Sequence, residues 1–413
     1  MYRTYNARPV PRPYRSRGTR RGVITSSVAV AIILVAYILY ALLRPLPALK
    51  TTLLPPVVPA QMAVNIPWPV AGQAAFGADE YGLLASHGAQ TPRPMASVTK
   101  AITALAVLEK KPLRHGETGP PIIMTQRDVD FYQQYAAKDG AIVPVSIGQS
   151  VTEYQALQAM LLPSANNLAD TTALWAFGSM DAYTKYANSM VKKLGMTQTT
   201  ITDASGFAPT TVSTASDLVK LGDAVLDHPV LAEIISQKQA EFPGYGTMNN
   251  VNNLLGQSGI RGIKTGNTDE AGGCYLSAAD IYIGNQKVTV ITAILGSASR
   301  PQAMKDSVPM IQSAVSEFQR VHVVRSGQEA GTVTAPWGAQ SKLTASKDIS
   351  VFSWTGTALA PRAAATSLET PVAADTTAGT FSLTYTGQTQ TADLRLRDAI
   401  AGPSAWWRLT HPL

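Results

Sequence analysis

Ser97 and Lys100 have residue types and a spacing that could carry out chemistry together. They occur in Met95-Ala-Ser-Val-Thr-Lys100, where Pro92 and Pro94 give way to a strongly helical run. A spacing of three residues places both side chains on one helix face, with Ser97 at or near the helix N-terminus. A lysine with a depressed pKa can take the proton of a serine hydroxyl, and N-terminal N–H groups can stabilise an oxyanion. The pair therefore indicates acyl transfer through a nucleophilic serine.

Two further polar elements follow downstream. Ser164 and Asn166 come after a helical pattern that Pro163 breaks, where one side chain could relay a proton and the other could hold a substrate amide. Such residues are also common as plain helix caps. Lys264 and Thr265 precede Gly266 on a predicted strand, where a cation and a hydroxyl could hold a carboxylate and the glycine would let a ligand approach the backbone. The alternative is a strand that ends in a turn with a solvated lysine.

Each of these elements alone is weak evidence, because Ser189 and Lys192 repeat the first spacing inside an ordinary helical pattern. Together, in this order and 67 and 100 residues apart, they form the set Ser-x-x-Lys, Ser-x-Asn and Lys-Thr-Gly. On these motifs the chain resembles the low-molecular-mass penicillin-binding proteins, the serine-type D-alanyl-D-alanine carboxypeptidases of peptidase family S11. The fragments that carry the resemblance are Pro94–Lys100, Leu161–Asn166, Lys193–Met196, Asp203–Phe207, Ser213–Asp217 and Gly262–Gly272.

The resemblance implies a catalytic role for three residues. Ser97 would be acylated by the penultimate D-alanine carbonyl, and Lys100 would be its general base. Ser164 would relay a proton to the leaving D-alanine, and Asn166 would contact the substrate amide. The reaction would remove the terminal D-alanine from peptidoglycan stem pentapeptides, and β-lactams would inhibit it covalently.

The resemblance also implies a set of substrate-binding residues. Lys264 and Thr265 would hold the terminal carboxylate, with Gly266 beside them, and Lys264 would help to keep the catalytic lysine neutral. The backbone N–H groups of Asn267 and of the nucleophile would form the oxyanion hole. Asn267 departs from the bulkier residue expected there, which leaves the tuning by its side chain open. Arg300 would assist with the carboxylate.

Other functions are less well supported by the residues. A class A β-lactamase needs a glutamate a few dozen residues beyond the middle motif, and the chain has none between Glu153 and Glu233. A weakly active or non-catalytic wall-binding scaffold would not need Ser97, Lys100 and Lys264. No metal or organic cofactor is expected, since the five histidines are scattered and Cys274 is the single cysteine. Cys274 is interpreted as a small apolar residue packing a strand, with a modifiable thiol near the cleft as the alternative.

The fold that must position these residues is expected to be α+β. Helical periodicity is common before residue 320, and short β-rich runs follow it. The resemblance implies a β-lactamase/DD-peptidase-like domain at 69–320, with an antiparallel sheet flanked by helices and a helical subdomain. A small all-β domain is expected at 321–413.

The N-terminal residues indicate a membrane anchor. Seven arginines in residues 1–22 account for the whole net charge of +7, so the remainder is neutral and no nucleic-acid partner is expected. Val23–Leu43 holds 21 residues without a charge, enough for a helix of about 31 Å. The positive-inside rule places residues 1–22 in the cytoplasm and the body outside the cell membrane. A cleaved signal peptide is the alternative. A proline-rich spacer is predicted at 44–68.

Overall fold

The computed structural model describes residues 17–57 and 63–411, so the predicted cytoplasmic tail lies largely outside the described residues. The chain forms two compact units. The first, here the mixed unit, is Ala60–Val321 with Phe352–Ala358. The second, here the β unit, is Met1–Pro59 with His322–Val351 and Leu359–Leu413.

An antiparallel sheet of five strands organises the mixed unit. Its strand order is β10-β11-β12-β2-β3. The bounds are β2 (Gln73–Ala78), β3 (Gly82–His87), β10 (Ile260–Thr268), β11 (Gly272–Ile283) and β12 (Gln286–Ser297). The strands β11 and β12 form a hairpin closed by a Gly-Asn turn, in which Gly284 has a φ of 58°. The predicted strand at the Lys-Thr-Gly motif is β10, at the edge of this sheet.

Both faces of this sheet are buried, because alternate residues of each strand pack against different helices. On β12, Ile291 and Leu295 belong to a core shared with α7 (Ala215–Leu226) and α2 (Thr99–Lys110). Val290 and Ile294 belong to a second core, shared with α9 (Arg300–Glu317). The period of two residues explains why these strands are almost continuously apolar.

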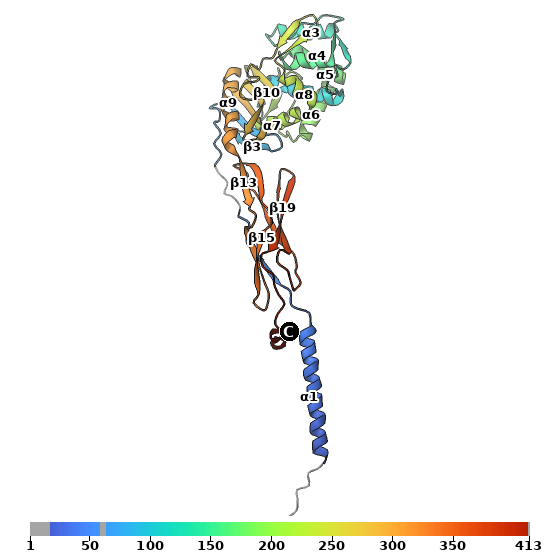
Figure 1. Ribbon diagram of the computed structural model, residues 1–413. Coiled ribbons are helices and arrows are strands. Elements are labelled where there is room, and N and C mark those ends of the chain that lie inside the picture. Colours follow the sequence, from blue (N-terminus) through green and yellow to red (C-terminus); the bar gives the residue numbers. More distant parts are fainter. Residues whose placement is uncertain (1–16, 58–62, 412–413) are drawn as a thin grey trace, which may run out of the picture. The chain divides into compact units, whose positions relative to one another are not determined.

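A group of helices lies beside the sheet, and Figure 1 shows α3, α4 and α5 together in it, away from α9. The helices are α3 (Gln126–Ala136), α4 (Glu153–Leu161), α5 (Asn166–Phe177), α6 (Met180–Lys193) and α8 (Pro229–Ser236). Short two-stranded sheets join β4 (Arg93–Pro94) to β7 (Val212–Ser213), β5 (Pro121–Ile123) to β6 (Ser150–Thr152), and β8 (Gln239–Phe242) to β9 (Gly246–Asn249). The antiparallel sheet, its flanking helices and this helical subdomain are the predicted α+β arrangement.

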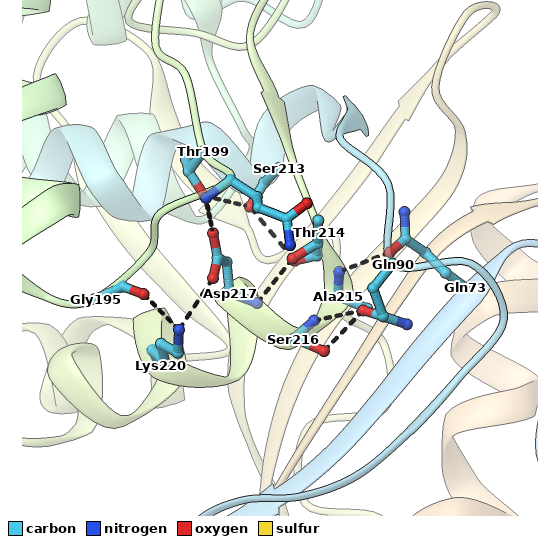
Figure 2. Close-up of polar contacts among 11 residues, drawn as sticks. Gln73, Gln90, Gly195, Thr199, Ser213, Thr214, Ala215, Ser216, Asp217 and Lys220 are labelled. Atoms are coloured by element: carbon cyan, nitrogen blue, oxygen red, sulfur yellow. Dashed lines mark hydrogen bonds and ion pairs between the residues drawn. The ribbon is translucent and has the colours of Figure 1, made fainter.

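The N-terminus of α7 is fixed by a polar network that ties the helix to the sheet (Figure 2). Thr214 caps the helix by accepting from the Asp217 N–H at 3.1 Å. The next free N–H group, that of Ala215, donates to Gln73 Oε1 on β2 at 3.1 Å. Asp217 is buried at the first turn, where the helix dipole favours a carboxylate, and Lys220 pairs with it at 3.2 Å.

The β unit contains a six-stranded antiparallel sheet with the order β1-β14-β15-β19-β18-β17. Its strands are β1 (Lys50–Leu53), β14 (Glu329–Thr334), β15 (Gln340–Ala345), β17 (Arg362–Ala365), β18 (Thr377–Tyr385) and β19 (Gln388–Leu396). The strand β13 (Phe318–Val324) pairs with β16 (Ile349–Trp354). The predicted spacer at 44–68 differs from the structure in one respect. Lys50–Leu53 is not free chain, because this proline-free stretch pairs with β14 as an edge strand.

The mixed unit also includes a segment that the predicted boundary at 320 assigns to the β domain. Phe352–Ala358 belongs to it because Trp354 is buried against Phe76 of the sheet, with ring centroids 5.1 Å apart. Trp354 also meets Phe318 at 5.1 Å. Aromatic packing of this kind buries a large apolar area. The free energy gained in this way outweighs the cost of bringing together segments that are far apart in the sequence.

The helix α1 (Arg17–Leu43) contains the apolar run of the predicted anchor. Its segment Gly22–Leu43 is long and apolar enough to cross a membrane, and its mean hydropathy is 2.5. A short helix that the sequence pattern did not indicate, α10 (Ala405–Thr410), lies against its C-terminal end. Arg408 Nη1 donates to the Leu42 carbonyl at 2.7 Å, which satisfies one of the last carbonyls of α1.

Candidate active site

Ser97 lies in a single turn of 3₁₀-helix, Ala96–Val98, that leads directly into α2. Ala96 has a φ of 48°, a left-handed conformation that costs free energy in a residue with a Cβ. Gly206 packs so closely that a Cβ there would lie 1.9 Å from the Ala96 carbonyl oxygen, so this turn admits glycine alone. Every residue in the stretch 95–108 is buried except Ser97, which is half-buried. The turn therefore presents one hydroxyl group to solvent from an otherwise buried helix start.

Lys100 is completely buried and makes three hydrogen bonds through Nζ. The atom lies 2.8 Å from Ser97 Oγ, 2.7 Å from Asn166 Oδ1 and 2.8 Å from the Ser205 carbonyl oxygen. The first contact is the helical i to i+3 pair that the sequence predicted. The other two cross 66 and 105 residues of chain.

Lys100 loses its proton at an unusually low pH for a lysine. Burial lowers its pKa to about 7, and the negative charges of Asp203 and Asp170 oppose that shift. A neutral amine has two N–H groups and one lone pair. The N–H groups can donate to Asn166 Oδ1 and the Ser205 carbonyl, which leaves the lone pair to accept the Ser97 hydroxyl proton. All three neighbours of Nζ therefore suit a general base.

Ser164 and Asn166 lie on the turn between α4 and α5. Ser164 has a φ of 68°, and its side chain is buried. The N-cap of α5 is Ala165, and it makes no side-chain cap bond, so the capping interpretation of this motif does not describe the structure. Asn166 instead uses its amide oxygen to accept from Lys100, and its own N–H donates to the Ala141 carbonyl at 2.7 Å. The motif therefore helps to orient Lys100.

The strand β10 brings the third motif against the turn that carries Ser97. A Cβ on Gly266 would lie 2.9 Å from the Met95 carbonyl oxygen and 3.1 Å from the Ser97 nitrogen. The strand can approach this closely because Gly266 has no side chain. The strand therefore lies directly beside the Ser97 backbone nitrogen, one of the two groups expected to form the oxyanion site. Lys264 and Thr265 are buried on the same strand, and Asn267 is exposed.

Lys264 lies in a cationic environment. Burial, followed by the charges of Lys100 and Arg300, holds its pKa well below the usual range. Arg300 is exposed at the first position of α9, beside a groove of about 460 Å³. The Asn267 side chain accepts from the Arg300 N–H at 3.3 Å. The unexpected residue at 267 therefore links β10 to the helix start that carries Arg300. Lys264, when it is charged, and Arg300 are suited to bind a carboxylate ligand.

The segment Asp203–Phe207 is part of the resemblance, but its residue types predict no role in the site. The structure places the Ser205 carbonyl on Lys100 Nζ and Gly206 against the Ala96 carbonyl. The motif Asp-Ala-Ser-Gly-Phe carried a usable signal, since a glycine beside small polar residues suggests a tight turn. What the turn contacts could not be read from it.

Cys274 is fully buried on β11 opposite Gly266, and burial raises the pKa of its thiol to about 11. This agrees with the packing interpretation. We expect Ellman's reagent to leave the native protein unmodified at neutral pH and to titrate one thiol after denaturation, because the thiolate is the reactive species. Rapid modification of the native protein would favour the alternative of an accessible thiol near the cleft.

The chain matches known proteins over this site and fold. The sequence model of the D-alanyl-D-alanine carboxypeptidase family S11 matches residues 78–299. D-alanyl-D-alanine carboxypeptidase DacA of Escherichia coli K12 is 26% identical over 320 residues, covering 74% of this chain and 78% of its own. Penicillin-binding protein 5 from Haemophilus influenzae has a TM-score of 0.58 at 18% identity, covering 83% of this chain and all of its own. Penicillin-binding protein D2 from Listeria monocytogenes, in an ampicillin-bound form, has a TM-score of 0.50 at 27% identity, covering 61% and 99%.

The similar structures confirm the predicted fold class, an α+β domain of the DD-peptidase type. The family match spans the first and third motifs and everything between them, including Ser97, Asn166 and Lys264. That match covers more than half of the chain. The chain therefore belongs to the D-alanyl-D-alanine carboxypeptidase family, peptidase family S11.

Proposed function

We propose that the protein removes the terminal D-alanine from peptidoglycan stem pentapeptides through an acyl-enzyme on Ser97. The observation that carries this proposal is the 2.8 Å contact between Ser97 Oγ and the buried Nζ of Lys100, a base that can be neutral near pH 7. Lys100 takes the hydroxyl proton as Ser97 attacks the carbonyl carbon between the two D-alanines. The developing oxyanion accepts from the backbone N–H groups of Ser97 and Asn267.

The other motif residues complete the reaction. Ser164 relays a proton to the amine of the leaving D-alanine, and Asn166 contacts the substrate amide while it orients Lys100. Lys264, Thr265 and Arg300 hold the terminal carboxylate. The arriving negative charge restores the charge of Lys264, whose pKa burial depresses. Water then hydrolyses the acyl-enzyme and returns Ser97.

A β-lactam ring is an acyl donor for the same serine, and the similar Listeria protein has been seen in an ampicillin-bound form. We therefore propose covalent penicillin binding. Between Glu153 and Glu233 the sequence offers no glutamate to activate a deacylating water, so the adduct should hydrolyse slowly. The β-lactamase and scaffold alternatives are not favoured.

We also propose that α1 anchors the protein in the cell membrane, with residues 1–22 in the cytoplasm and the mixed unit outside. The support is the length and hydropathy of Gly22–Leu43 and the arginines that precede it. The proposed domain limits are a tail at 1–22, an anchor at 23–43, a connecting segment at 44–68, a catalytic domain at 69–320 and a β domain at 321–413, within which Phe352–Ala358 packs with the catalytic domain.

The test of the proposed function has two readouts. The purified ectodomain is expected to become covalently labelled by a fluorescent penicillin and to release D-alanine from a peptide that ends in D-Ala-D-Ala. Labelling with slow D-alanine release would indicate a weak peptidase. A protein that shows neither reaction at any pH contradicts the enzymatic proposal.

The rate of penicillin acylation is expected to depend on pH through Lys100. Lys100 must be neutral to act as a base, and its pKa is about 7. The second-order rate constant should therefore be highest above this pH and fall about tenfold per unit below it. Stopped-flow or quenched labelling of the wild-type ectodomain across this range measures the curve. A rate that is flat through neutral pH would contradict a lysine base of this pKa.

A further inference from the structure

A network of buried and half-buried polar groups continues from Lys100 into the helical subdomain. Asp170 is on α5, four residues after Asn166, so both side chains lie on the same face of that helix. Tyr135, near the end of α3, donates its hydroxyl proton to Asp170 Oδ2 at 2.8 Å. The same hydroxyl oxygen lies 3.1 Å from Ser205 Oγ.

Ser205 connects this polar network to Lys100, the base. Its carbonyl accepts from Lys100 Nζ at 2.8 Å, and its hydroxyl donates to Asp203 Oδ2 at 2.8 Å. Asp203 in turn accepts from the Phe207 N–H at 2.9 Å and from the Thr211 hydroxyl at 2.6 Å. The turn that holds the carbonyl on Lys100 is therefore fixed by its hydrogen bonds to Asp203, and the Tyr135 hydroxyl oxygen lies against Ser205 Oγ.

The carboxylates of this polar network, Asp170 and Asp203, influence the pKa of Lys100. Burial raises the pKa of Asp170 to about 7, and the Tyr135 hydrogen bond and the charge of Lys100 oppose that shift. Asp170 and Asp203 in turn stabilise the charged form of Lys100. The other titratable groups that face this centre are Lys264 from β10, whose pKa the charge of Lys100 helps to lower, and the buried hydroxyl of Tyr183 from α6.

We propose that Asp170 is a positioning residue that, together with Tyr135, sets the charge state of Lys100 and holds the Ser205 carbonyl against it. Asp170 does not contact Ser97 or the substrate carboxylate site. It acts through Tyr135, whose hydroxyl oxygen lies against Ser205 Oγ, and through its negative charge in a buried site, where charges interact strongly. The proposal rests on the proposed serine acylation.

The test is the pH dependence of acylation by a fluorescent penicillin in the full-length Asp170→Asn protein. Asparagine keeps an oxygen that accepts from Tyr135 but removes the negative charge. The charged form of Lys100 loses a stabilising neighbour, so its pKa falls. The acidic limb of the rate profile should move to lower pH by about 0.5 to 1 unit, with the maximal rate changed less than about threefold.

Tyr135→Phe provides a second, independent variant. Without the donor, Asp170 is protonated more easily and carries less charge at neutral pH. The acidic limb should move in the same direction by a smaller amount. If the Asp170→Asn protein does not fold, this variant decides, and an acidic limb that remains in place overturns the proposal.

Asp128→Asn is the matched control. Asp128 is also a buried carboxylate beside α5, where it accepts from Thr171 at 2.7 Å, but it caps α3 and is not among the charges that act on Lys100. Its loss should lower the melting temperature and leave the acidic limb in place. An equal shift in both variants, or no shift or an upward shift in Asp170→Asn, overturns the proposal. A wild-type protein that is not labelled at any pH would instead overturn the proposed function.

Discussion

Ser97→Ala should abolish covalent labelling by a fluorescent penicillin and reduce D-alanine release by about 10³-fold or more. Ser97 is the one residue of the stretch 95–108 that is not buried, and its hydroxyl contacts Lys100 Nζ. The Thr99 and Thr103 hydroxyls of that stretch are buried and donate to backbone carbonyls, so they are not placed to form the acyl-enzyme. Loss of a nucleophilic serine leaves the residual catalysis that binding and the oxyanion site supply.

Ser189→Ala is the matched control for this prediction. Ser189 stands in the second Ser-x-x-Lys of the chain, on α6, where both Ser189 and Lys192 are exposed. The two sites share their spacing and differ in burial and in tertiary partners. The control should label and turn over like the wild type. Labelling that survives in Ser97→Ala, or disappears in Ser189→Ala, would contradict the assignment of Ser97 as the nucleophile.

Lys100→Met should slow acylation by about 10²- to 10⁴-fold, the range expected for loss of a general base. Methionine has a similar length and suits the buried position, so the helix α2 should remain packed. The side chain can neither take the Ser97 proton nor donate to Asn166 and Ser205. The second-order rate constant for penicillin acylation measures the loss, and higher pH should not restore it.

Lys192→Met is the corresponding control, since Lys192 is exposed and its loss should leave acylation unchanged. Thermal unfolding of both variants separates catalysis from folding. The Lys100→Met protein leaves the Asn166 amide oxygen and the Ser205 carbonyl without a donor, which should lower its melting temperature by a few degrees. Acylation at the wild-type rate in a folded Lys100→Met protein would show that another group is the base.

Local physical chemistry explains what could be predicted for the fold. The helix that follows Ser97, the strand that carries Lys264 and the hairpin after it have clear apolar patterns, and the structure contains them as α2, β10 and β11 with β12. The structure differs from the predicted organisation at two segments, and both involve long-range packing. Lys50–Leu53 joins β14, and Phe352–Ala358 joins the mixed unit through Trp354. A sequence pattern shows that a segment suits a strand or a core, but it does not identify the segment against which it packs.

The reactive groups that this protein presents follow from local sequence. The three motifs and their order specify a serine, a lysine three residues away on the same helix face, and a cationic strand, because spacing along one helix or strand fixes local geometry. The basicity of Lys100, in contrast, depends on long-range contacts of the folded chain. Its partners Asn166 and Ser205 are 66 and 105 residues away, and burial among them lowers its pKa. Desolvation depends on everything that surrounds a group, so the folded chain must be seen before a Ser-x-x-Lys pair in the core can be told from the one on the surface.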